Sequence, residues 1–226
     1  MADPSDTNAR PGGRPRDPHI DAAVLAATLG LLDEVGYTNV SLEEVARRAG
    51  TSRPAIYRRW SNRPALVLAA IGSRLDVPTA PDTGCTLCDI GDSFNIFLAA
   101  YRTIRPDAYI ALYSECVRDP ELQQRYVQTV VEPSRDAVRE TLRRAVDRGD
   151  LRDDVDVEQL LDVIASLAHY RVLFGQHLSD DEAEKVIETL LQGAAVDYAA
   201  LLAHSEALER EHFDSSGAHH VSTTHT

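Results

Sequence analysis

The stretch TSRPAIYRRW, residues 51–60, gathers two hydroxyls, three arginines, a tyrosine and a tryptophan into ten residues. The whole chain of 226 residues has a net charge of −13, so nothing in its average composition calls for positive charge here. Hydroxyl and guanidinium groups donate hydrogen bonds to phosphate oxygens and to the edges of bases. These residue types therefore indicate a nucleic-acid partner, although an ordinary solvated helix is the alternative.

Two short helices and a tight turn are predicted to position this stretch. Ser41 and Glu44 form the pattern S-x-x-E, which predicts a capping box at the start of a helix that ends at Gly50. Thr51 or Ser52 then caps a second helix, with a proline in its first turn. Such a pair is typical of a helix-turn-helix, whose second helix fits the major groove of DNA.

The faces of the second helix follow from its apolar spacing. Ile56 and Trp60 lie four residues apart and are expected to face inward. The side chains then expected to face outward are Ser52, Arg53, Ala55, Arg58 and Arg59. The predicted helix-turn-helix spans residues 41–60 within a domain of residues 17–76, with one helix before it and one after.

The run GYTNVSLEEVARRAGTSRPAIYRRWSNRPALVLAAI, from Gly36 to Ile71, resembles the TetR family of bacterial transcriptional regulators. It contains, in order, a G-Y turn, A-x-x-A-G-T-S, Y-x-x-W and a capped fourth helix. The resemblance implies an all-α homodimer, in which three helices bind DNA, the fourth connects, and the remainder binds a ligand and dimerises. It also implies a regulator, most often a repressor that a small molecule releases from DNA, rather than an enzyme.

The resemblance assigns DNA contacts position by position. The residues of the second helix that fall where family members touch bases or phosphates are Thr51, Ser52, Arg53, Ala55, Tyr57, Arg58 and Arg59. Ser41 (or Leu42) and Arg63 fall where phosphates are clamped. Tyr57 matches a phosphate-binding tyrosine of the family, and partly buried packing is the alternative for it.

Two features modify this assignment. Because proline and alanine occupy positions 54 and 55, base recognition is expected to depend on Arg53 and Arg58, with Ala55 against a thymine methyl. The first 16 residues are predicted to form a flexible basic arm, whose Arg14 and Arg16 could follow the DNA backbone or enter the minor groove. A disordered arm without a role is the alternative.

Composition and charge limit the class of protein. A hydrophobic fraction of 43% allows a sizeable core, no apolar run approaches the roughly 20 residues that cross a bilayer, and no signal peptide is recognisable. A soluble cytoplasmic protein is therefore expected. Residues 1–75 carry 10 Arg against 8 acidic residues, whereas residues 76–226 carry 13 Lys and Arg against 28. This asymmetry indicates that one end meets a polyanion.

Residues 77–202 are predicted to form a helical ligand-binding and dimerisation domain without a β-sheet, followed by a disordered tail, residues 203–226. Apolar spacing predicts helices at about 89–104, 106–117, 119–148, 156–174 and 180–202. Pro133 should kink the third of them or mark a break. The last two carry broad apolar stripes that are expected to pair with a second copy, or else to pack within one chain. A symmetric dimer implies a palindromic operator.

Aromatic residues with polar tips are frequent in the middle of this domain, which favours a small-molecule site. The candidate lining residues are Phe97, Tyr101, Tyr109, Tyr113, Tyr126, His169, Tyr170 and Phe174. Plain core packing is the alternative for each of them. The pattern does not identify the effector, and neither a cofactor nor a metal is expected.

Cys85 and Cys88 have the C-x-x-C spacing of a redox pair or of half a zinc site. No second pair in the folded region completes a metal set, and an odd total of three cysteines suits a reducing compartment. The alternative function is a redox-responsive regulator of the same family, and coincidental loop cysteines compete with it. No nucleophile elbow, phosphate loop or H-E-x-x-H motif supports an enzyme.

Overall fold

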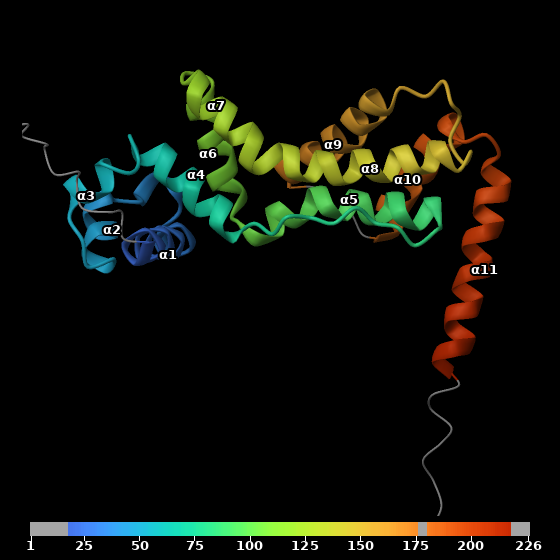
Figure 1. The fold of residues 1–226 in the computed structure, drawn as a ribbon, viewed down its shortest axis with the longest axis horizontal. Helices are drawn as coiled ribbons and strands as arrows, with labels where there is room; N and C mark the ends of the chain where they lie inside the picture. The colour runs from blue at the N-terminus through green and yellow to red at the C-terminus, as the bar shows by residue number, and fades with distance from the viewer. Residues whose placement is uncertain (1–17, 176–179, 218–226) are drawn as a thin grey trace, which may run out of the picture.

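The computed structural model describes residues 18–175 and 180–217. Within these ranges the chain forms α-helices and no β-strand, and an isolated bridge joins Leu151 to Ala195. Figure 1 shows an elongated molecule, with the first four helices at one end and α11 at the other. The all-α prediction is confirmed.

The first four helices and a short 3-10 turn form the end that carries the helix-turn-helix. Their bounds are α1 (Pro18–Val35), η1 (Tyr37–Asn39), α2 (Leu42–Arg48), α3 (Arg53–Tyr57) and α4 (Arg63–Arg74). Helix α1 packs along α4, and α2 packs against both α1 and α3. The apolar side chains buried between them include Val24, Leu32, Val45, Ile56 and Leu66.

The remaining elements form the longer part of the molecule. Their bounds are α5 (Thr86–Thr103), α6 (Pro106–Cys116), α7 (Pro120–Tyr126), the π-helical segment η2 (Val127–Val131), α8 (Glu132–Asp147), α9 (Val157–Leu173), α10 (Asp180–Ala194) and α11 (Tyr198–Gly217). One core cluster lies between α5, α8, α9 and α10. Tyr109 and Leu112 of α6 and Leu122 of α7 belong instead to the core under the first four helices. Helices α6 and α7 are therefore fastened to the helix-turn-helix end.

The predicted kink at Pro133 takes the form of a π-helical segment. Helix α7, η2 and α8 follow one another directly, and Pro133 lies in the first turn of α8. A proline has no N–H to donate and its ring crowds the carbonyl four residues earlier, which is that of Thr129 within η2. The wider π turn accommodates this conflict without ending the helix.

The prediction of a single helix over residues 180–202 is wrong. Helix α10 ends at Ala194, and α11 begins at Tyr198 after a short turn. The loop before α9 pairs with this turn, because Arg152 N–H donates to the carbonyl of Ala194 at 3.1 Å and Val196 N–H donates to that of Asp150 at 3.2 Å. These backbone bonds replace the helical ones that would have continued α10.

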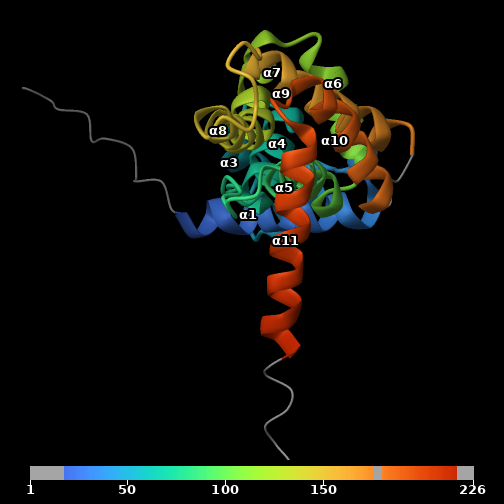
Figure 2. The same ribbon diagram turned by 90° about the vertical axis from the view of Figure 1, so that its right-hand side faces the viewer.

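The predicted disorder of residues 203–226 is wrong for residues 203–217, which belong to α11. Residues 218–226 lie outside the described ranges. Figures 1 and 2 show α11 projecting away from the rest of the molecule, with its first turns beside α5. The α11 segment is rich in alanine, leucine and glutamate, which favour helix, and its first turns gain stability by packing on α5.

Candidate nucleic-acid interface and ligand cavities

The helix-turn-helix forms through the predicted caps and turn. Gly50 ends α2 with a positive φ of 62°, a region that favours glycine. Ser52 has extended backbone angles at the N-cap of α3, and its hydroxyl accepts a hydrogen bond from the N–H of Ala55 at 3.4 Å. Of the two predicted caps, Thr51 or Ser52, the structure selects Ser52. Helix α3 is thereby presented directly after the turn.

Several side chains of the predicted recognition face are exposed to solvent. Ser52, Arg53, Tyr57 and Arg58 are exposed, and Thr51 is half-buried. Among the residues that the structure describes, neither the Arg53 nor the Arg58 guanidinium has a hydrogen-bond or ion-pair partner. Two cations without a described partner, at the first residue and at the C-cap of a five-residue helix in an acidic chain, are the strongest electrostatic sign of an anionic partner.

The expected outward orientation of Ala55 is wrong, because this side chain is only 8% exposed and packs inward next to Ile56. The same holds for Arg59. Its guanidinium forms an ion pair with Asp21 of α1 and donates to the carbonyl of Ala55 at 3.0 Å, which leaves the side chain 13% exposed. Arg59 therefore fastens the end of α3 to α1. Its partner lies 38 residues away, so no local pattern could have separated it from Arg58.

The capping box predicted at the start of α2 does not form. Ser41 occupies the N-cap position, but its hydroxyl makes no capping hydrogen bond. The Glu44 carboxylate accepts instead from Arg47 at 2.6 and 2.8 Å and from Arg48 at 2.8 Å. These guanidinium hydrogen bonds lower the pKa of Glu44 to about 2. The exposed Ser41 hydroxyl is left available for the phosphate contact expected of it.

Arg63 lies at the start of α4, beside the turn that precedes α2. Its guanidinium lies 4.8 Å from the centre of the Tyr37 ring and donates to the carbonyl of Thr38 at 3.3 Å. Tyr37 is 3% exposed, and burial together with the nearby Glu115 carboxylate of α6 raises its pKa to about 12. The predicted phosphate clamp is thus positioned by a neutral tyrosine that α6 also touches. The arm residues Arg14 and Arg16 lie outside the described residues.

Several residues of the predicted aromatic lining lie close to one another. Tyr101 lies 4.8 Å from Tyr109 and 5.4 Å from His169 between ring centres, both edge to face. Tyr113 and Tyr126 form a second pair at 6.4 Å. Burial raises the pKa values of the Tyr101 and Tyr109 hydroxyls, so these groups stay neutral donors.

The other three predicted lining residues differ in burial. Tyr170 and Phe174 form a pair at 4.8 Å and are 50% and 66% exposed. Phe97 is buried in the core between α5, α8, α9 and α10.

Three cavities along the described part of the chain bear on this prediction. A groove of about 430 Å³ along α8 and α9 is lined by three of the predicted residues, His169, Tyr170 and Phe174. A cavity of about 300 Å³ lies where α4, α5 and η2 meet, with Gly72 and Thr129 in its wall. Phe97, Tyr101, Tyr109, Tyr113 and Tyr126 line none of the three.

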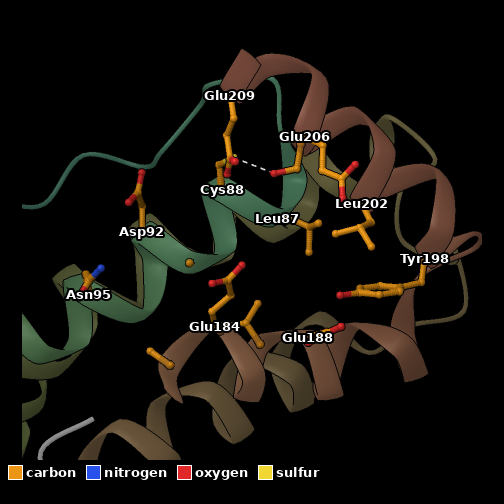
Figure 3. A pocket seen from close by; sticks show the side chains of 14 residues that line it. Leu87, Cys88, Asp92, Asn95, Glu184, Glu188, Tyr198, Leu202, Glu206 and Glu209 are labelled. Atoms are coloured by element: carbon orange, nitrogen blue, oxygen red, sulfur yellow. Dashed lines mark hydrogen bonds between the residues drawn. The ribbon is translucent and has the colours of Figure 1, made fainter. Parts of the chain in front are cut away.

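The largest of these three, about 540 Å³, lies between α5, α10 and α11 (Figure 3). None of the eight predicted aromatic residues lines it. Sequence analysis missed it because it depends on the turn that separates α10 from α11. The only available signal was the density of acidic residues on both sides of that turn, in the segments 181–188 and 206–209.

The two cysteines of the C-x-x-C pattern are close together, but they are poorly suited to redox sensing. Their sulfur atoms lie 2.7 Å apart, and Cys85 is buried. Burial and the hydrogen bond to Cys85 raise the pKa of Cys88 to about 11, so the reactive thiolate is scarce near neutral pH. No cluster of metal ligands occurs among the described residues. The redox alternative has no support here.

Family comparisons agree with this geometry. Residues 24–70 match the family described as "Bacterial regulatory proteins, tetR family", and residues 80–190 match "Tetracyclin repressor-like, C-terminal domain". The HTH-type transcriptional regulator YdeS of Bacillus subtilis is 30% identical over 184 residues, which cover 80% of this chain and 92% of YdeS. The chain belongs to the TetR family.

Further relatives of this TetR-family chain carry the same description. The DNA-binding transcriptional repressor TetR of Mycobacteroides abscessus is 30% identical over 176 residues, 75% of this chain and 90% of that one. The crystal structure of the TetR family transcription regulator SCO0332 has a TM-score of 0.61 at 29% identity, covering 77% of this chain and 98% of that one. The resemblance stated from the sequence is confirmed: the protein is a DNA-binding transcriptional regulator with a helix-turn-helix, not an enzyme. None of its described helices is long and apolar enough to cross a membrane.

Proposed function

We propose that this TetR-family regulator is a dimeric repressor, which binds a palindromic operator and leaves it when a small molecule binds the C-terminal domain. The observation that carries the DNA-binding part is that Arg53 of α3 and Arg58 at its C-cap are exposed and have no partner among the described residues. Repression is favoured by the 30% identical relative named as a DNA-binding transcriptional repressor. DNA contacts are proposed for Ser41, Thr51, Ser52, Arg53, Tyr57, Arg58 and Arg63.

An unpartnered apolar stripe on α9 supports the dimer. Val163, Tyr170 and Phe174 are 47%, 50% and 66% exposed, and with the half-buried Leu167 they follow the helical spacing of one face. Leu161, Ile164 and Ala168 on the other face are buried within the chain, so α9 packs on both sides if a second copy covers the stripe. The groove along α8 and α9 would then lie at the edge of this interface.

Effector release requires a connection between the C-terminal helices and α4. Arg74 at the end of α4 binds Asp33 of α1 at 2.6 and 2.8 Å and donates to the carbonyl of Thr103 in α5 at 3.4 Å. On the same helix, Gly72 is so close to η2 that a Cβ there would lie 2.5 Å from the Thr129 methyl. A ligand that favours a different position of α5 or η2 would therefore shift α4 and the spacing of the two α3 helices.

Genome-wide capture tests this function. Full-length protein is incubated with sheared DNA from its own organism, the retained DNA is sequenced, and the assembly state is measured by sedimentation. Enrichment of a palindrome by a dimer is expected. Arg53→Ala should weaken operator binding by about 1–3 kcal/mol and relax sequence preference. The matched control is Arg143→Ala, which removes an exposed arginine of α8 and should change nothing.

Two outcomes would contradict the proposal. If no site is enriched even after unfolding and refolding have stripped any bound ligand, DNA recognition by α3 is refuted. If Arg53→Ala binds the captured operator as tightly as Arg143→Ala does, the assignment of the recognition face is wrong.

A further inference from the structure

The cavity between α5, α10 and α11 combines an apolar floor with a negatively charged wall. Its apolar lining comes from Leu87 of α5, Ile187 of α10 and Leu202 of α11, together with the ring of Tyr198. Leu202 is 40% exposed although it faces the interior of a three-helix arrangement. Exposed apolar surface inside a cavity is what an organic ligand covers.

Carboxylates from all three helices line the same space, and no Lys, Arg or His is among the lining residues. They are Asp92, Glu184, Glu188, Glu206 and Glu209. Figure 3 shows that Glu184 and Glu206 approach the space from opposite helices. The nearest cation along α11, Arg210, donates to the backbone carbonyl of Glu206 at 3.0 Å. Its guanidinium is therefore bound to the backbone and not to the Glu206 carboxylate.

Carboxylates elsewhere in the domain do have arginine partners. Arg135 and Arg139 bind Glu158, Arg144 binds Glu140, and Arg148 binds Asp89. Within the described residues, none of the five cavity carboxylates takes part in an ion pair of this kind. Several acidic groups near α8 and α9 thus have arginine partners, whereas the five cavity carboxylates lie together without one. The negative potential of the cavity favours a cationic occupant.

The spacing of these carboxylates argues for an extended organic cation rather than a metal ion. No group of three or more metal-binding side chains converges among the described residues, so the five carboxylates do not share one coordination centre. Tyr198 adds an aromatic face, and burial with the neighbouring Glu188 raises its pKa to about 12, which keeps the ring neutral. A neutral tyrosine face beside carboxylates attracts an alkylated or protonated amine.

We propose that this cavity binds an organic cation: a protonated or quaternary amine joined to an apolar body. The body covers Leu87, Ile187 and Leu202, and the cationic group lies between the carboxylates of α10 and α11. That this ligand also regulates DNA binding rests on the proposed function. Helix α5 would connect the cavity to the DNA-binding end. It lines the cavity at Leu87, and at its other end the carbonyl of Thr103 accepts a hydrogen bond from Arg74 of α4.

Three probes that share a phenyl ring and a four-carbon chain test the charge preference in the full-length protein without DNA. They are 4-phenylbutylamine, 4-phenylbutan-1-ol and 4-phenylbutyrate, and their binding is measured by calorimetry or ligand-observed NMR. The amine should bind best and the carboxylate least. Glu184→Gln and Glu206→Gln should each weaken amine binding roughly 3–10-fold and leave the alcohol unchanged, as removal of one nearby charge predicts.

Asp147→Asn is the matched control, because Asp147 is an exposed carboxylate of α8 outside the cavity. Equal binding of all three probes, no binding of the amine, or an equal effect of Asp147→Asn and Glu184→Gln would overturn the site. A second titration follows operator affinity by fluorescence anisotropy. If the amine binds but operator affinity does not change, the regulatory role fails while the site stands. If the protein binds no operator at all, the proposed function fails, and calorimetry still decides the site.

Discussion

Arg58 and Arg59 are adjacent in the sequence, but the structure gives them different tasks. The Arg58 side chain is exposed and has no partner among the described residues, whereas Arg59 is paired with Asp21 and the carbonyl of Ala55. Arg→Met at each position removes the charge and keeps most of the aliphatic stem. Arg58→Met should therefore lose operator affinity and keep its stability. Arg59→Met should lose stability and keep its operator affinity.

The magnitudes follow from burial. Arg59 is 13% and Asp21 34% exposed, so their pair is worth more than a surface ion pair, and its loss should cost about 1–2 kcal/mol of unfolding free energy. For a chain of this length such a loss lowers Tm by roughly 2–8 °C. Arg58→Met should leave Tm unchanged and weaken specific binding by about 1–3 kcal/mol, or roughly 5- to 150-fold.

Thermal unfolding and fluorescence anisotropy with the captured operator, at a temperature well below either Tm, measure the two effects separately. Asp21→Asn should reproduce the stability loss of Arg59→Met and retain operator affinity. The reasoning is refuted if Arg59→Met keeps its Tm and loses as much affinity as Arg58→Met, because Arg59 would then face the DNA.

Three further predictions concern the phosphate clamp, the first turn and the acid range. Arg63→Ala should weaken binding to all DNA sequences alike and reduce the slope of log K against log salt by about 1, measured by anisotropy at several salt concentrations. Gly36→Ala should destabilise the fold by about 1–2 kcal/mol or more in urea unfolding, because Gly36 has φ 73° and a Cβ would lie 2.8 Å from the Asp107 carboxylate. Gly193→Ala is the control. A Cβ there meets nothing within 4 Å, so this variant should not destabilise the fold. The pKa of Glu44 is lowered from 4.5 to about 2, so its stabilisation is fully present above pH 4.5 and lost as pH falls toward 2. Urea unfolding of Glu44→Gln should thus differ from that of the unaltered protein at neutral pH and converge with it below about pH 2; a difference that persists there would contradict the linkage.

The local features of the DNA-binding end could be predicted because each depends on residues close in sequence. The cap at Ser52, the turn at Gly50 and the inward position of Ile56 follow from backbone preferences and helical spacing. The capping box at Ser41 failed for an equally physical reason. Glu44 had other partners within reach, and two guanidiniums bind a carboxylate more strongly than a backbone N–H does.

The ligand cavities could not be predicted because their walls come from segments far apart in the chain. The largest one joins Leu87 to Tyr198 and Glu206, and it exists only because a loop near residue 151 interrupts the helix that apolar spacing predicted to continue through residue 202. Aromatic residues such as Tyr101 and Phe97 were predicted to line a cavity because of their residue type. Residue type alone does not distinguish a cavity wall from a filled core.

By itself the sequence determined the all-α class, the helix-turn-helix at residues 41–60 and membership of a regulator family, since these depend on spacing, caps and one contiguous motif. Only the tertiary structure decided which arginines of the recognition stretch are paired. Arg53 and Arg58 have no partner among the described residues, while Arg59 meets an aspartate 38 residues away. It also decided where α10 ends, and with that the position of an acidic cavity between three helices. Both outcomes depend on contacts between distant segments, for which neighbouring residues carry no signal.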